Sequence, residues 1–333
     1  MAVLLLKRIS KRIHIISKDF KRDMRNFSFK ITMTNLLKNL TCLGGPIKRV
    51  NKWCVKKRDN QIFSYLYKNN IEVFQKYSGA TDCGEDSKEK YVWVCWLQGE
   101  ENAPQLVKKC IESIRRNTKN YKMTVIDLNN YSEYVKLPDV VVRKFASGNI
   151  SPAHFSDVLR VYLIRDYGGL WLDATIFCSD EVPTEIFEYS FFSCKSPVIK
   201  ERYISDYQWT TFVLGGKKNG LFYSFLADFY KSYWCNNDCA VDYLFLDYTI
   251  ALARRHISAI DNDIEIVPIN NTKRDELQAC FNEEYNEEKF KGIINSDTYL
   301  HKLSWRMDFN MCTDDGKQTF FGFFIDDLKS FRR

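Results

Sequence analysis

Residues 151–175 contain side chains suited to binding an anionic ligand that is rich in oxygen atoms. Asp157 and Arg160 stand three positions apart, and Asp173 follows a pair of glycines and a short apolar run. A guanidinium binds phosphate or sugar oxygens, and a carboxylate accepts bonds from hydroxyl groups or holds a hard cation such as Mg²⁺ or Mn²⁺. The chemistry open to this set is the binding of a diphosphate together with its metal ion.

Local signals in the same stretch predict how these side chains are positioned. Ser151-Pro152 is typical of a helix start, and Gly168-Gly169 favour a sharp end after Tyr167. A short strand is expected over 170–172, with the aspartate at its end. The helix is apolar on most of its surface, so Asp157 and Arg160 are expected to be buried. Two interpretations remain open: an ion pair that stabilises the helix, or two groups that face a ligand.

The preceding residues predict a parallel sheet. Residues 91–97 are typical of a buried strand that ends before Gly99, a helix is expected from Pro104 to Asn117, and a second strand over 123–126. A strand, helix and strand at this spacing form a βαβ unit. Ligands of such sheets bind beyond the carboxyl ends of the strands, where Gln98-Gly99 fall.

The motif as a whole resembles that of a known family. Ser156-Asp157-x-x-Arg160, followed by Tyr167-Gly168-Gly169-Leu-Trp-Leu-Asp173-Ala-Thr175, resembles the signature of the capsular polysaccharide synthesis glycosyltransferases. That family is similar to the Och-type mannosyltransferases and to the glucosylating clostridial toxins. Further blocks resemble the family in the same order across roughly residues 61–310: Trp93-x-x-Trp96-x-Gln98-Gly99, Asp242-Tyr-x-x-x-Asp247-Tyr248 and His301-Lys302-Leu303.

The resemblance implies an α/β chain with an A-type glycosyltransferase fold. That fold is a Rossmann-like nucleotide-sugar domain with a mostly parallel central sheet, here with a helical N-terminal appendage. The implied activity is retaining transfer of a hexose-like sugar from a nucleotide-sugar donor, UDP-sugars first, to a polysaccharide, oligosaccharide or lipid-linked glycan in capsular or surface polysaccharide synthesis. The alternative is a degenerate member that binds carbohydrate or membrane without turnover.

The resemblance also assigns roles to residues. Donor-binding residues would be Gln98, Gly99, Ser156, Asp157, Arg160, Gly168, Gly169 and Asp173. Catalytic residues would be Asp173, Asp247 and Lys302. A divalent cation, Mn²⁺ or Mg²⁺, would be held by Asp173, Thr175 and His301. The chain departs from the wider pattern at Thr175, where a neutral hydroxyl replaces the second acid of the DxD-type motif.

For the later blocks the residues alone leave alternatives open. Asp242 and Asp247 are expected on one helix over 241–254, about 140° apart, so they cannot share one small site. Asp247 is favoured for the cleft and Asp242 for the helix N-terminus, but caps and core ion pairs are equally compatible with both. His301-Lys302 could serve a diphosphate leaving group or be an exposed basic pair.

The chain divides into four parts. We expect a basic amphipathic arm over 1–60, a helix and linker over 61–90, a catalytic domain over 91–313 and a peripheral segment over 314–333. The arm carries 16 Lys/Arg against 3 Asp/Glu within residues 1–59, a net +13, which leaves −6 for the rest of a chain whose total is +7. This asymmetry is typical of a tether.

The arm has apolar residues at helical spacing, at Ile9, Ile13, Ile16, Phe20 and Met24. Such a helix could lie in an anionic membrane surface, or it could pack on the body or remain a basic tail. A nucleic-acid partner is disfavoured because aromatic residues do not alternate with the basic ones. The 11 scattered cysteines form no CxxC pair, and no run approaches about 20 apolar residues, so we expect a cytoplasmic protein with its arm at the inner face of the cell membrane.

Overall fold

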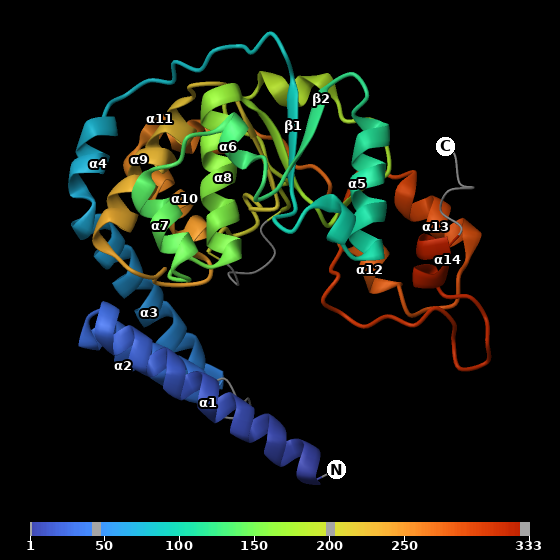
Figure 1. The fold of residues 1–333 in the computed structure, drawn as a ribbon, viewed down its shortest axis with the longest axis horizontal. Helices are drawn as coiled ribbons and strands as arrows, with labels where there is room; N and C mark the ends of the chain where they lie inside the picture. The colour runs from blue at the N-terminus through green and yellow to red at the C-terminus, as the bar shows by residue number, and fades with distance from the viewer. Residues whose placement is uncertain (1, 42–47, 198–203, 327–333) are drawn as a thin grey trace.

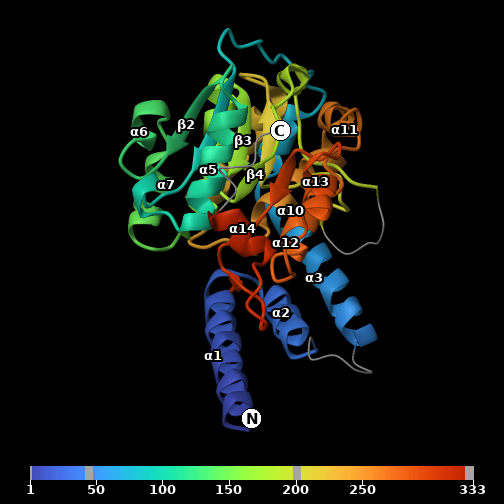
Figure 2. The ribbon, with the colours of Figure 1, turned by 90° about the vertical axis from the view of Figure 1, so that its right-hand side faces the viewer.

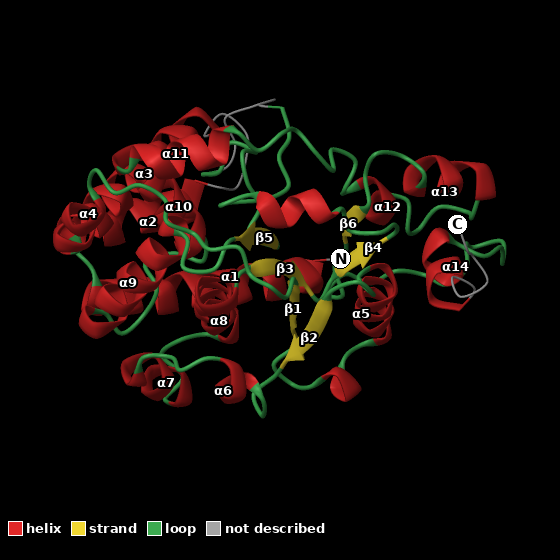
Figure 3. Ribbon diagram, turned by 90° about the horizontal axis from the view of Figure 1, so that it is seen from above, coloured by secondary structure: helices red, strands yellow, loops and turns green. Residues whose placement is uncertain are grey.

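The central sheet of the protein has four strands. The computed structural model describes residues 2–41, 48–197 and 204–326, and in it the strands are ordered β2-β1-β3-β5. Strand β1 (Tyr91–Cys95) runs parallel to β2 (Lys122–Ile126) and to β3 (Gly169–Asp173), and β5 (Val213–Gly216) is antiparallel to β3. Helices lie on both sides of the sheet (Figure 3). The predicted α/β class with a mostly parallel central sheet is therefore confirmed.

The register aligns the carboxyl ends of the parallel strands. Cys95 is opposite both Ile126 of β2 and Asp173 of β3. The residue that ends β3 therefore lies beside the segment that follows β1. Helix α8 (Pro152–Tyr167) packs on β1, β3 and β5, which places its cleft-facing side chains at the same edge.

A second, two-stranded ladder brings a distant part of the chain to this edge. Strand β4 (Ile176–Cys178) is antiparallel to β6 (Leu300–Lys302), with Ile176 opposite Lys302. The backbone N–H of Leu303 also donates to the carbonyl of Thr175 at 3.0 Å. These contacts fix Lys302 next to the end of β3.

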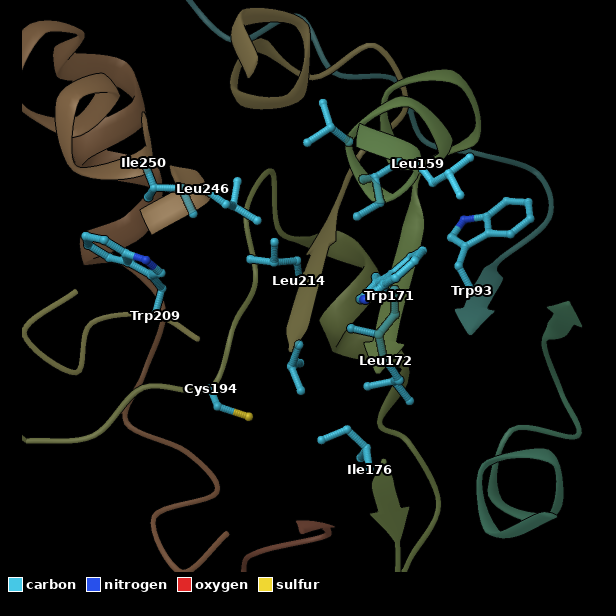
Figure 4. Close-up of a cluster of buried hydrophobic side chains, with 14 of the residues drawn as sticks. Trp93, Leu159, Trp171, Leu172, Ile176, Cys194, Trp209, Leu214, Leu246 and Ile250 are labelled. Carbon is cyan, nitrogen blue, oxygen red and sulfur yellow. The ribbon is translucent and has the colours of Figure 1, made fainter. Parts of the chain in front are cut away.

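The core is built on the two faces of β3. Trp171 and Leu172 are buried and, as neighbours in a strand, point to opposite faces; Trp93 and Leu159 belong to the same cluster of buried side chains (Figure 4). The Trp93 indole N–H donates to the carbonyl of Gly168 at 3.0 Å, so a large buried side chain also has its polar atom satisfied. The described cysteines are free thiols.

The remaining helices complete the body. Helix α9 (Leu221–Asn236) packs on α8, and α10 (Phe245–His256) packs on α9 and α11 (Ser258–Glu265). The helix predicted over 241–254 is α10, which begins later than expected, at Phe245. The other elements are α4 (Ile71–Tyr77), η2 (Glu100–Asn102), α5 (Gln105–Asn117), α6 (Tyr131–Tyr134), α7 (Asp139–Ala146), η3 (Thr184–Glu188), α12 (Glu276–Ala279), α13 (Glu287–Ile294) and α14 (Phe320–Asp326).

The N-terminal appendage is a layer of three helices. Helices α1 (Ala2–Asn26) and α2 (Phe29–Thr41) project from the body, and α3 (Lys48–Asn69) joins them to it (Figures 1 and 2). The expected boundary at residues 60 and 61 lies within α3. In the described ranges, none of the helices is both long enough and apolar enough to cross a membrane.

Candidate active site

A cleft of about 420 Å³ opens at the carboxyl ends of β1 and β3. It is lined by the loop after β1, one side of α8, the end of β3, the start of α10 and the segment after β6. Most of the predicted site residues line it: Gln98, Ser156, Asp157, Arg160, Asp173, Thr175, Asp247 and Lys302. The fold therefore brings together residues that are spread over more than half of the sequence.

Asp173 is the most strongly held acid of the cleft. Its carboxylate accepts from Lys302 Nζ at 3.1 Å, from Arg160 Nη2 at 3.3 Å and from the Trp171 indole N–H at 3.0 Å. Burial alone would raise its pKa, but the two cations and the indole outweigh burial, so the pKa of Asp173 lies below its ordinary value. Asp173 is therefore ionised at neutral pH.

Arg160 is buried, with 5% of its surface exposed, and its head group reaches the cleft. One guanidinium nitrogen donates to the carbonyl of Thr211 and lies 3.4 Å from Asp157, and the group lies 4.8 Å from the centre of the Trp171 ring. The structure therefore shows an ion pair that also lines the cavity, and contact of the two groups with a ligand stays a prediction. Burial raises the pKa of Asp157 despite this partner.

Thr175 and Asp173 both accept a hydrogen bond from the ammonium group of Lys302. Lys302 Nζ donates to Thr175 Oγ1 at 2.7 Å as well as to Asp173. Within the described part of the chain, no group of three or more His, Cys, Asp or Glu side chains could hold a metal ion. One carboxylate and one hydroxyl still fit Mg²⁺ or Mn²⁺ if phosphates and water supply the other ligands, as is common for Mg²⁺. Lys302 would then have to leave both oxygens.

Asp247 also lines the cleft, from the first turn of α10. Its carboxylate accepts from the Trp209 indole N–H at 3.0 Å. Burial raises the pKa of Asp247 to about 7, and the negative charge of Asp157 adds to this effect while Trp209 opposes it. Asp242 lies before the helix, outside the cleft, where it pairs with the buried Arg58 of α3.

The two glycines of the motif lie away from this site. Gly168 and Gly169 are at the start of β3, whereas Asp173 is at its end, about 13 Å further along the strand. Gly169 has φ of 106°, and a Cβ there would lie 2.4 Å from the carbonyl oxygen of Tyr91. The structure therefore does not place these glycines in the cleft: Gly169 lets β3 approach β1, and Gly168 lies against the backbone of Gly216 and Lys218.

Two other predicted residues also lie outside the cleft lining. Gly99, with φ of 83°, forms the turn after β1, next to Gln98. His301 is fully buried, and its Nε2 is 3.1 Å from Ser179 Oγ. It neighbours Lys302 in β6 and therefore points to the opposite face of the strand. Burial lowers the pKa of His301 to about 4. The structure does not bring His301 together with Asp173 and Thr175 as a metal ligand.

The cleft also contains aromatic residues to which the sequence gives no role in the site. Trp96 and Trp305 both line it, with ring centres 5.6 Å apart in an edge-to-face arrangement, and Trp305 is 42% exposed. Trp209, which donates to Asp247, has no predicted role in the site. Trp305 stands close to the His301-Lys302 block, which was a usable signal, whereas no local pattern connects Trp209 to Asp247.

Comparisons relate the chain to known proteins. A family model described as capsular polysaccharide synthesis protein matches residues 46–323. The chain is similar to Glycosyltransferase afumC of Aspergillus fumigatus (strain CBS 144.89 / FGSC A1163 / CEA10), at 32% identity over 112 residues. That match covers 31% of this chain and 28% of the length of the relative. Among solved structures, the chain is similar to the PaToxG Glycosyltransferase, with a TM-score of 0.36 and 14% identity over 76% of this chain and 100% of that one.

Proposed function

Because the chain belongs to the capsular polysaccharide synthesis protein family, we propose that it is a glycosyltransferase that moves a sugar from a nucleotide-sugar donor to a glycan acceptor. One observation carries the proposal. An ionised carboxylate, Asp173, ends a central parallel strand, and Lys302 and Arg160 hold it inside a cleft of about 420 Å³. A cleft with fixed cations beside a fixed carboxylate suits a ligand that carries both phosphates and hydroxyl groups.

The donor occupies the side of the cleft formed by α8 and β6. Lys302 and Arg160 bind the diphosphate, and their attraction grows as negative charge builds on the departing oxygen. Asp157 and Gln98, which line the same cavity, accept or donate bonds to ribose and sugar hydroxyls. UDP-sugars are the donors to test first, and the expected outcome is transfer with retention of the anomeric configuration.

A divalent cation would be held by Asp173 and Thr175. When bound, it supplies further positive charge to the diphosphate. The chain itself contributes Lys302, which already lies 3.1 Å from Asp173 and 2.7 Å from Thr175 and so delivers one positive charge to the same place. We therefore expect a modest loss of turnover with a chelator.

The acceptor enters on the side of Asp247. This carboxylate has a pKa of about 7, so it can accept a proton from an acceptor hydroxyl near neutral pH. The polysaccharide, oligosaccharide or lipid-linked glycan is held against the anomeric carbon, and much of the rate gain comes from this positioning. The basic arm places the enzyme at an anionic membrane surface, where lipid-linked acceptors are available.

Donor hydrolysis tests the proposal directly. Purified protein is incubated with UDP-, GDP- and CMP-sugars in Mn²⁺, Mg²⁺ or chelator, and nucleotide release is measured. We expect one donor to be cleaved by the wild type, and Asp173→Ala to abolish cleavage. Asp166→Ala is the matched control, because Asp166 pairs with Arg165 and does not line the cleft.

The alternative outcomes are distinct. A chain that binds no donor by calorimetry and cleaves none is not a glycosyltransferase, and the non-catalytic binding protein becomes the better description. Donor binding without release, restored by an added glycan acceptor, supports a transferase that protects its donor from water.

A further inference from the structure

Helix α2 has its polar side inward and its apolar side outward. Its buried residues are Ile31, Thr32, Thr34 and Asn35, of which three are polar. Its exposed residues are Phe29, Lys30, Leu37 and Leu40, of which three are apolar. A surface helix that packs on a protein body has the opposite arrangement. The apolar side of α2 therefore exposes to water side chains that would be more stable in an apolar environment.

Hydrogen bonds within the appendage satisfy the inward polar side. Thr34 Oγ1 donates to Gln61 of α3 at 2.7 Å, and Asn35 Nδ2 donates to Asp23 of α1 at 2.6 Å. These bonds hold α2 between α1 and α3, which lie on either side of it (Figure 2). The orientation of α2 is thus fixed by its neighbours, and a rotation that buried the leucines would break both bonds.

The outward apolar residues form one stripe. Phe29, Met33, Leu37 and Leu40 are spaced four, four and three positions apart, which places them on the same side of a helix. Phe29 is 65% exposed, Leu40 50% and Leu37 40%. Met33, between them, is half-buried, so the exposed part of the stripe in the described ranges is made by Phe29, Leu37 and Leu40.

Charge indicates what the stripe contacts. The first 59 residues carry a net +13, and Lys18, Lys21, Arg25 and Lys30 are exposed on α1 and α2. A second copy of so basic a surface would be repelled, whereas anionic lipid head groups would be attracted. A helix of 13 residues is about 20 Å long, which suits a helix lying in the plane of an interface.

We infer that α2 is the element that docks on the membrane, with the stripe Phe29, Met33, Leu37 and Leu40 inserted among anionic lipids and the basic residues of α1 and α2 contacting the head groups. This inference rests on the membrane association proposed above and specifies its surface. It differs from the expectation from sequence, which placed the apolar stripe on residues 9–24. It does not depend on the chemistry in the cleft.

Vesicle sedimentation of the full chain tests the inference. Wild type should sediment with phosphatidylcholine vesicles that contain phosphatidylglycerol, much less with phosphatidylcholine alone, and less as salt is raised. The double variant Leu37→Ser/Leu40→Ser should bind the anionic vesicles at least about tenfold more weakly, because it loses most of the insertable apolar area. The matched control is Ile266→Ser/Ile269→Ser, which removes two apolar side chains of the body that are 63% and 56% exposed.

Several results would overturn the inference. The first is that the leucine variant binds vesicles as well as wild type does. The second is that the isoleucine control loses as much vesicle binding as the leucine variant. The third is that wild type does not bind vesicles. Light scattering that shows a wild-type dimer and a monomeric leucine variant would assign the stripe to contact between copies. Donor hydrolysis without vesicles is measured for every variant. A variant that hydrolyses the donor normally but no longer binds vesicles supports the docking surface. A wild-type protein that hydrolyses no donor refutes only the proposed function.

Discussion

The ammonium group of Lys302 lies 3.1 Å from the carboxylate of Asp173, although 129 positions separate the two residues in the chain. The contact is made because β6 pairs with β4, which directly follows the end of β3. It places a permanent positive charge beside the acid that the sequence motif predicts to hold a metal ion. The negative charge of Asp173 is thus partly neutralised by a side chain of the protein, Lys302.

Replacement of Lys302 by Met should lower turnover far more than donor affinity. The ammonium acts mainly on charge that develops as the diphosphate leaves, so kcat should fall by about 10²–10³-fold while donor Kd changes by less than tenfold. Steady-state kinetics and calorimetry measure the two quantities. Lys317→Met is the control, since Lys317 pairs with Glu284 on the surface. Equal losses in kcat and affinity would show that Lys302 only binds the donor.

The pH dependence of transfer should report Asp247. Its pKa is raised to about 7, so the basic form, and with it the rate, should increase as pH rises through about 7. Asp247→Asn should remove this step and lower the rate at pH 8. A rate profile that keeps its midpoint in the Asn variant would assign the titration to another group.

The same raised pKa predicts an effect on stability with the opposite sign. The folded state binds the proton of Asp247 more tightly than the unfolded chain, so the stabilising contribution is complete below about pH 4 and is lost as pH rises to about 7. The free energy of unfolding of wild type should therefore decline over this window relative to Asp247→Asn. Urea unfolding at several pH values measures the difference, and parallel curves for the two proteins would contradict it.

Gly169→Ala should lower the free energy of unfolding and leave donor affinity unchanged. With φ of 106° and a Cβ position 2.4 Å from the Tyr91 oxygen, the alanine strains the backbone and pushes β3 away from β1. We expect a loss of about 1–3 kcal/mol or more in unfolding free energy, with unchanged donor affinity at a temperature where the variant is folded. Gly292→Ala, which meets no atom within 4 Å, is the control. Lost affinity in a fully folded variant would return Gly169 to the donor site.

Removal of Arg58 should destabilise the junction between the arm and the body. Arg58 is 3% exposed and pairs with Asp242, so Arg58→Met leaves a half-buried carboxylate without its partner, at a cost of about 3–5 kcal/mol. The double variant Arg58→Met/Asp242→Leu should recover most of this loss. Thermal unfolding of the two single variants and the double variant gives the coupling energy, and additive losses would refute it.

The part of the site that is local in sequence could be predicted. Ser151-Pro152 and Gly168-Gly169 bound a helix of the expected length, and the three-residue spacing of Asp157 and Arg160 put both on one side of it. The parts set by tertiary contacts could not. No local pattern shows that Trp209 holds Asp247, or that Lys302 faces the cleft while its neighbour His301 faces the core. That choice depends on the register of β6 against β4.

The appendage shows a different limit. Periodicity alone marks an apolar stripe on a helix but does not say which side is covered by the protein. In α2 the side chains of Thr34 and Asn35 are inward because Gln61 and Asp23 bind them. The partners lie on other helices, so the reversed orientation follows only from the assembled structure.

The separation of Gly169 from Asp173 within one short motif has a consequence for how relatives of this chain are sorted. Gly169 allows β3 to pack against β1, whereas Asp173 contacts Lys302 and Arg160 in the cleft. On the proposed function, we predict that a relative that keeps the glycines and tryptophans but has lost Asp173 retains the fold and much of the motif similarity without turnover. The same proposal predicts that active members are separated from inactive ones by positions 160, 173 and 302 taken together.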